Sequence, residues 1–181
     1  MSDKNANVPA VLGDPARVAE HRCLSALSTH AVNTESLEIT RPSVTNCPDG
    51  GHDLGITGKV EEVLSVVSTL TETPIEELQF LNSSAKKGKL TVRVDVKNVE
   101  TITGDTIDVH TKHSTQSPHC QVNLIMPTNP EVIITPAAQE KLEKQAALFK
   151  EDGVLMGITT VNGLEQIESN NQNVICNTGD K

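Results

Sequence analysis

Nine consecutive residues alternate between polar and apolar side chains, and this run constrains the fold more than any other feature of the chain. Between Lys89 and Lys97 every second residue is apolar: Leu90, Val92, Val94 and Val96. Successive side chains of a β-strand point to opposite faces of a sheet. The run therefore predicts a strand with one buried face and one solvent-exposed face.

A second alternating run follows directly. Ile107, Val109 and Thr111 alternate with polar residues after the sequence Thr-Gly-Asp-Thr at residues 103–106. Glycine and aspartate are common in tight turns between paired strands. We therefore expect an antiparallel hairpin formed by this run and residues 89–97.

Further strands are expected in the second half of the chain. Asn162-Gly163 is the dipeptide best suited to a type I′ hairpin turn, so it predicts a hairpin between the apolar segments on either side of it. The predicted strands are residues 122–126, 132–134, 154–161, 164–167 and 174–176.

Four segments carry helix signals. Asp14-Pro15 and Thr135-Pro136 each combine a capping residue with a proline suited to the first helical position. Thr73-Pro74 is followed by Glu76, which suggests a capping box with Thr73 as the capping residue. The predicted helices are residues 14–31, 60–67, 73–80 and 135–153.

This order of elements predicts an α+β fold. We expect a mostly antiparallel or mixed β-sheet, with N-terminal helices and one later helix packed on one face. A chain of 181 residues suits one domain, which we assign to residues 14–181. Residues 1–13 are expected to be a flexible or partner-bound arm, and residues 33–55 a long irregular loop with strand-like alternation at Leu37 and Ile39.

Composition and charge weigh against several classes of function. The chain has two Phe, no Tyr and no Trp, and its formal net charge is −9 at pH 7. The phosphate backbone of a nucleic acid repels a negatively charged protein. Proteins bind single-stranded nucleic acid mainly by stacking its bases on aromatic side chains, which are scarce here, so direct nucleic-acid binding is disfavoured. We find no signal peptide and no run long enough to span a membrane, so a cytoplasmic protein is expected.

One cluster of residues has the chemistry of a metal site. The sequence contains none of the common dinucleotide, P-loop, hydrolase or zinc-protease motifs. Zinc binds about four imidazole or thiolate ligands. The candidate ligands are His110, His113, His119 and Cys120, with Cys47 and His52 as further partners. We favour the alternative that this segment is a polar loop with solvated histidines.

Three basic residues form a candidate partner site. Lys89, Arg93 and Lys97 share the polar face of the predicted strand, where they could receive an acidic partner or a phosphate. Such charges more often keep a sheet face soluble or protect an edge from pairing, and we favour that interpretation.

The sequence therefore favours a non-enzymatic structural or adaptor subunit that acts through protein–protein contacts, with self-association or a protein partner. Two alternatives stay open. One is an enzyme that uses zinc or a cysteine in the His110–Cys120 segment, and the other is a regulatory module that binds a small ligand.

Overall fold

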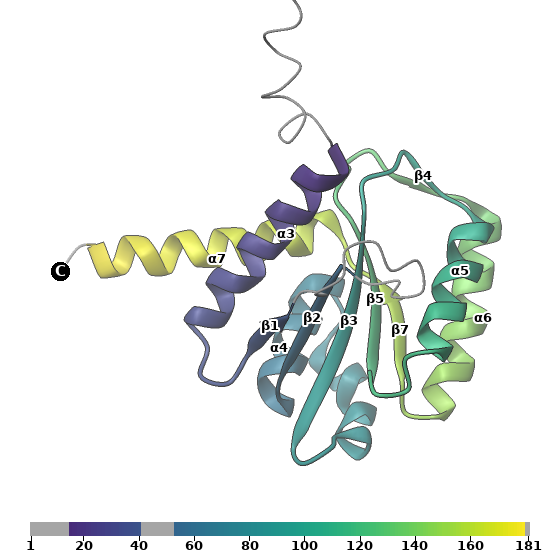
Figure 1. Ribbon diagram of the computed structural model, residues 1–181, viewed down its shortest axis with the longest axis horizontal. Coiled ribbons are helices and arrows are strands. Elements are labelled where there is room, and N and C mark those ends of the chain that lie inside the picture. Colours follow the sequence, from purple (N-terminus) through teal and green to yellow (C-terminus); the bar gives the residue numbers. More distant parts are fainter. Residues whose placement is uncertain (1–14, 41–52, 180–181) are drawn as a thin grey trace, which may run out of the picture.

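The computed structural model describes residues 15–40 and 53–179, and its centre is a mixed five-stranded sheet (Figure 1). The strands lie in the order β1-β2-β3-β5-β7. Their bounds are Glu38–Thr40 for β1, Leu54–Lys59 for β2, Lys89–Lys97 for β3, Val122–Pro127 for β5 and Leu155–Ile158 for β7. A separate pair of short strands consists of β4 (Thr101–Ile102) and β6 (Ile133–Ile134).

The sheet changes from antiparallel to parallel at β3. Strands β1, β2 and β3 pair antiparallel, whereas β5 pairs parallel to β3, and β7 pairs parallel to β5. Parallel neighbours need a crossover, and α5 and α6 supply the two that join β3, β5 and β7. The predicted α+β class with a mixed sheet is confirmed.

Helices cover both faces of this sheet. Their bounds are Pro15–Val32 for α3, Val60–Thr71 for α4, Ile75–Ser84 for the 3₁₀ helix η1, Gly104–Thr115 for α5, Pro136–Glu151 for α6 and Val161–Gly179 for α7. The larger core packs α3, α4, η1 and α7 on the face that carries Val92, Val94 and Leu124. The smaller core packs α5 and α6 on the face that carries Ile125 and Met156.

Several predicted elements are confirmed. The strand over Lys89–Lys97 has the predicted bounds, and helices begin at Pro15 and Pro136. The side chain of Thr135 accepts a hydrogen bond from the Ala138 N–H, as its predicted capping role requires. The helix expected over residues 60–67 extends to Thr71.

The predicted cap at Thr73 is wrong. Residues 75–84 form a 3₁₀ helix whose N-cap is Pro74, and no side chain caps it. Proline at this position has no hydroxyl to offer, and the Thr73 hydroxyl donates to the Thr71 carbonyl.

The predicted hairpin over residues 107–111 is also wrong, because this segment lies in α5. Thr103 and Thr106 form a capping box at the start of the helix instead of a turn. The buried face of α5 consists of Ile107, His110 and Ser114, at helical spacing. Two of these three residues are polar, so the hydrophobic pattern does not reveal the helix.

The predicted turn at Asn162-Gly163 and the predicted strands 164–167 and 174–176 are wrong as well. All three segments lie in the helix α7. Leu164 and Ile167 are three residues apart, so both lie on one helix face and pack into the larger core. Gly163 packs against the backbone at the end of α4. Tertiary packing therefore overrides the turn preference of the dipeptide.

Some predictions lie outside the described residues. These are the arm over residues 1–13 and the central part of the long loop, residues 41–52. Within the described part of the predicted loop, Ile39 lies in β1, in agreement with its strand-like alternation. Within the described ranges, no helix combines the length and the apolar character needed to cross a membrane.

Gly163 provides a test of the packing between α4 and α7. A Cβ atom at this position would overlap the carbonyl oxygens of Thr69 and Leu70. Although alanine normally stabilises a helix relative to glycine, we expect Gly163→Ala to lower the free energy of unfolding by about 2–4 kcal/mol. Urea denaturation of the two proteins measures this change.

Gly104→Ala is the matched control. Gly104 also lies in the first turn of a helix, but its Cβ would meet the flexible end of Lys141 at 3.3 Å. We expect this variant to change the free energy of unfolding by less than about 1 kcal/mol. Equal losses in both variants would contradict the proposed packing at Gly163.

Candidate functional site

The side chain of Arg93 lies inside the protein, between β3 and α5. Arg93 is 1% exposed and Asp95 is 5% exposed, although both belong to the polar side of the alternating run. The predicted solvent-exposed face of this strand is therefore wrong at its centre. The physical reason is that α5 covers this part of the sheet, where the hairpin prediction placed a strand.

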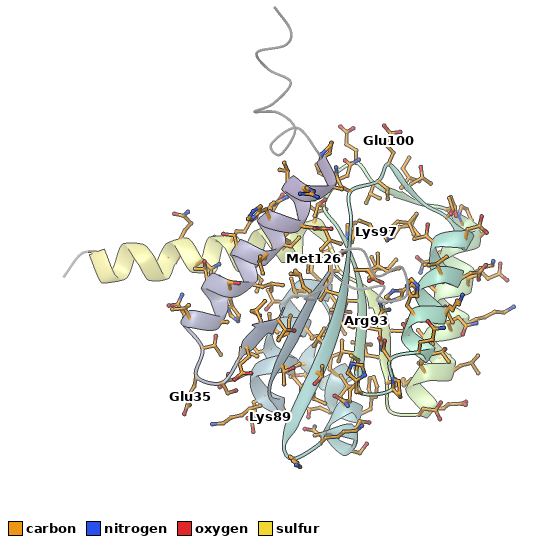
Figure 2. The ribbon with its side chains drawn as sticks, viewed as in Figure 1. Glu35, Lys89, Arg93, Lys97, Glu100 and Met126 are labelled. Carbon is orange, nitrogen blue, oxygen red and sulfur yellow. The ribbon has the colours of Figure 1, made fainter. Side chains whose placement is uncertain are left out.

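The burial of Arg93 separates it from Lys89 and Lys97, the other two residues of the predicted partner site. Figure 2 shows Lys89 at one end of β3, Lys97 toward the other end and Arg93 between them. Lys89 is exposed and Lys97 is half-buried, whereas Arg93 is enclosed. The three cations therefore do not present one basic surface to a partner.

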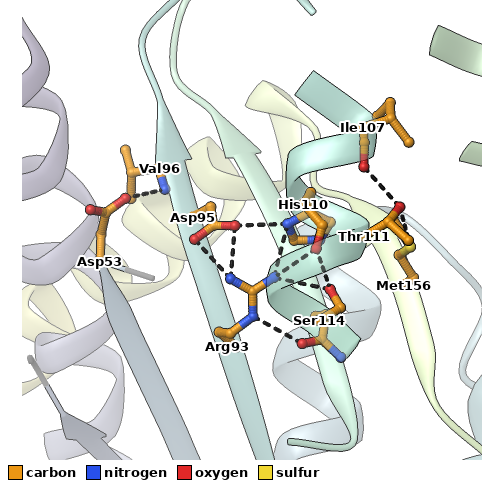
Figure 3. Close-up of polar contacts among 10 residues, drawn as sticks. Asp53, Arg93, Asp95, Val96, Ile107, His110, Thr111, Ser114 and Met156 are labelled. Atoms are coloured by element: carbon orange, nitrogen blue, oxygen red, sulfur yellow. Dashed lines mark hydrogen bonds and ion pairs between the residues drawn. The ribbon is translucent and has the colours of Figure 1, made fainter. Parts of the chain in front are cut away.

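Arg93 forms the centre of a buried polar cluster that also contains Asp95, His110, Ser114 and Asn123 (Figure 3). Its Nε donates to Asn123 Oδ1 at 3.0 Å, and its Nη1 donates to both oxygens of Asp95 at 3.0 and 2.9 Å. Its Nη2 donates to Ser114 Oγ at 3.0 Å and to the His110 carbonyl at 3.4 Å. Each of the three guanidinium nitrogens therefore donates within the cluster.

His110 contacts both Asp95 and Arg93 through one ring nitrogen. His110 Nδ1 lies 2.7 Å from Asp95 Oδ2 and 3.0 Å from Arg93 Nη2. The guanidinium group can only donate, so we assign the Nδ1 proton to the bond with the carboxylate. In this tautomer His110 Nε2 carries a lone pair, and this buried atom has no hydrogen-bond partner among the described residues.

An Asp–His pair of this kind resembles the base of a catalytic site, but the hydroxyl nearest to it among the described residues, that of Ser114, does not complete one. The Ser114 hydroxyl donates to the His110 carbonyl at 2.8 Å and accepts from Arg93, so it is engaged away from Nε2. Ser114 and His110 are both buried. A nucleophile must reach both its base and its substrate, and this hydroxyl meets neither requirement.

The four predicted metal ligands lie in different environments. His110 belongs to the buried cluster, His113 is half-buried, His119 is exposed and Cys120 is buried. Burial lowers the pKa of His113 below its ordinary value. Among the described residues, no group of three or more His, Cys, Asp or Glu side chains is placed to hold one metal ion. Cys47 and His52 lie outside the described residues.

Cys23 and Cys120 are also poorly suited to nucleophilic chemistry. Cys23 and Cys120 are free and buried. Burial raises the pKa of the Cys120 thiol despite the nearby charges of Arg93 and Lys86, and it raises the pKa of Cys23 to about 12. The thiolate is the reactive form, so a raised pKa opposes the activation that a catalytic cysteine needs.

The accessible feature of greatest chemical interest is an apolar groove between η1 and α6. We call it the η1–α6 groove, and its volume is about 610 Å³. Its lining residues are Thr73, Glu76, Glu77, Leu78, Phe80, Ala146, Ala147, Lys150 and Leu155. More of its lining is apolar than polar, which is typical of surfaces that bind other molecules.

Specific contacts hold the two walls of this groove. The Ser84 hydroxyl at the end of η1 donates to the Gly153 carbonyl, after the end of α6, at 2.6 Å. The Lys150 ammonium group lies 5.2 Å from the centre of the Phe80 ring, a cation–π contact between the walls. The groove is therefore defined by contacts within the chain itself.

Sequence reasoning missed most of these residues. Asp95, Ser114 and Asn123 were not singled out, and the groove residues come from two segments about seventy positions apart. The spacing of Ile107, His110 and Ser114 on one helical face was the available signal for the cluster. The groove had no local signal, because only tertiary packing brings its walls together.

Comparison with known protein families, curated proteins and solved structures found no match to this chain.

The buried cluster predicts strong coupling between Arg93 and Asp95. Asp95→Ala removes the carboxylate that accepts two hydrogen bonds from the buried guanidinium group, so we expect it to lower the free energy of unfolding by about 3–5 kcal/mol. Arg93→Met removes the cation beside the Asp95 carboxylate, which keeps only its contact with His110, and should cost a similar amount. Because the double variant buries neither charge, its loss should be smaller than the sum of the two single losses by at least about 1 kcal/mol.

Chemical denaturation of the three variants and the wild type measures this coupling. Circular dichroism establishes that each variant is folded before the comparison. Additive losses would show that Arg93 and Asp95 contribute independently, contrary to the ion pair described above.

Proposed function

We propose that this protein is a non-enzymatic subunit that acts by binding protein, and that the η1–α6 groove is its binding surface. The observation that carries the proposal is the contrast between the two sites. The side chains of Asp95, His110 and Ser114 are buried and bonded to one another or to Arg93, whereas the groove is accessible and mostly apolar.

The distribution of aromatic residues supports this proposal. The chain has only two aromatic side chains, Phe80 and Phe149, and both are only half-buried. Phe80 lines the groove, whereas Phe149 packs against the smaller core. Aromatic side chains are enriched at the centres of protein interfaces, where their burial contributes much of the binding energy.

The charge of the protein supports a protein ligand rather than a nucleic acid. The formal net charge is −9, and the groove carries Glu76 and Glu77 beside a single cation, Lys150. Phosphate groups would be repelled by this balance. A cytoplasmic setting, which we also propose, suits the free thiols of Cys23 and Cys120.

Ala147→Arg tests the use of the groove. Ala147 is exposed and lines the groove, so an arginine there should fill the site without disturbing the core. Tagged wild type and variant are recovered from the cells that express the protein, and the bound proteins are quantified by mass spectrometry. We expect the variant to retain at least about tenfold less of the specific partner, a loss typical of an interface residue.

Ala137→Arg is the matched control, because Ala137 is also exposed on α6 but does not line the groove. The same partner should be recovered with this control and with the wild type. Equal recovery with Ala147→Arg and Ala137→Arg would show that the groove does not bind protein, and would contradict the proposal.

A further inference from the structure

We propose that four lysines at one end of the β2–β3 pair bind an acidic segment of another protein. We call these residues the lysine patch, and they are Lys59, Lys86, Lys87 and Lys89. All four are exposed, and none of them lines the η1–α6 groove. This second site goes beyond the proposed function and does not depend on it.

The sheet register and a tight turn bring the four lysines together. Lys59 and Lys89 are Cα partners in the antiparallel pairing of β2 with β3, so their side chains lie on the same face of the sheet. Lys86 and Lys89 exchange two backbone hydrogen bonds, of 2.9 and 3.1 Å, which close a two-residue turn formed by Lys87 and Gly88. Figure 1 shows this turn at the lower end of the sheet, where β3 begins.

The turn holds Lys87 in a backbone conformation that lysine rarely adopts. Lys87 has a φ of 55° and Gly88 has a φ of 75°. A two-residue turn with positive φ at both positions is of type I′, and its first position favours asparagine, aspartate or glycine. The left-handed conformation is unfavourable for lysine, so Lys87 opposes folding at this position.

The lysine patch also places like charges against one another. Like charges directly opposite in a sheet destabilise the pair, whereas opposite charges stabilise it. The Lys59 ammonium group has an exposed ion pair with Glu35 at 3.7 Å. Among the described residues, Lys86, Lys87 and Lys89 form no ion pair with an acidic side chain. Positive charge is therefore concentrated here in a protein whose net charge is −9.

Two ordinary roles of surface lysines do not explain this arrangement. Lysines protect the edges of sheets from pairing, but β2 and β3 are interior strands of the five-stranded sheet. Charges also keep a surface soluble, but a mixture of both signs does this without the repulsion between Lys59 and Lys89. A conformation or contact that opposes folding is typical of a site retained for binding.

The lysine patch presents hydrogen-bond donors to a ligand. Each ammonium group donates and cannot accept. Thr57 and Thr91 are the next pair on the same face, and their half-buried hydroxyls, 3.4 Å apart, also have donor capacity. A ligand that matches these groups must carry several negatively charged acceptors close together.

A short run of Asp or Glu residues fits the lysine patch better than a nucleic acid or an anionic membrane does. The planar fork of arginine recognises phosphate most specifically, and aromatic side chains stack on bases, but the lysine patch contains neither. An extended polyanion would also face the acidic remainder of the protein. A flexible acidic segment reaches the lysines alone, because salt screens charges beyond about 8 to 10 Å.

Fluorescence anisotropy with a labelled octaglutamate peptide tests this binding on the purified full chain. At about 0.1 M salt we expect a dissociation constant on the order of 10 to 100 μM, which rises with salt concentration. An octaglutamine peptide should not bind. Failure of the wild type to bind octaglutamate would overturn the proposal.

Lys89→Glu and its matched control locate the binding by charge. Lys89→Glu should raise the dissociation constant at least about tenfold. Lys144→Glu makes the same change of net charge at an exposed lysine of α6, and should change the dissociation constant by less than about twofold. Equal losses in the two variants would overturn the assignment to the lysine patch.

Carbodiimide cross-linking locates the bound peptide directly. The reagent joins a glutamate carboxylate to a contacting lysine as an amide, with loss of water, and mass spectrometry identifies the lysine. We expect cross-links at the lysine patch. Cross-links mainly at other lysines would overturn the assignment.

Lys87→Asn separates binding from stability. Asparagine favours the first position of a type I′ turn, so we expect the Tm to rise by about 2 to 4 °C. The same change removes a charge from the lysine patch and should weaken octaglutamate binding at least about threefold. A variant that binds the peptide like the wild type would overturn the proposed role of Lys87.

Two further probes decide the class of ligand. Vesicles of phosphatidylserine and phosphatidylcholine, and a single-stranded oligothymidylate, should each bind at least about tenfold more weakly than octaglutamate. Tighter binding of either probe would overturn an acidic protein segment as the ligand. Ala147→Arg should bind octaglutamate like the wild type, so failure of the proposed groove function leaves this result unchanged. Loss of peptide binding in Ala147→Arg would contradict the independence of the two sites.

Discussion

The buried ion pair of Arg93 and Asp95 is the interaction on which the arrangement of β3, β5 and α5 depends. A guanidinium group inside a protein must have all its donors satisfied, and here the acceptors come from all three elements. Asn123 supplies the contact from β5, whereas His110 and Ser114 supply those from α5. The helix is therefore held on the sheet by directed polar contacts beside an apolar core.

This dependence explains what the sequence could and could not predict. The strand at Lys89–Lys97 followed from its alternation, and the starts of α3 and α6 followed from a capping residue and a proline. The α5 helix was missed because its buried face carries His110 and Ser114, which do not register as hydrophobic. Arg93 was placed in solvent for the same reason, since its burial follows from the helix above it.

The same packing determines which candidate functional side chains are accessible to other molecules. The described residues that the sequence marked as metal ligands lie in separate environments, and Cys23 and Cys120 are buried. The η1–α6 groove is one accessible surface, and its walls are far apart in the sequence. Its lining is mostly apolar, so its burial would contribute mainly hydrophobic free energy to the protein binding that we propose.

Chemical modification of the histidines tests most directly whether the Arg93 cluster is a closed structural unit. Diethyl pyrocarbonate reacts with accessible imidazole nitrogens, and mass spectrometry of peptides measures the rate at each residue. The account predicts rapid modification of the exposed His119 and strong protection of His110 until the protein is unfolded. If His110 in the folded protein reacted as fast as His119, the cluster would be open to solvent, and the assignment of a purely structural role would be contradicted.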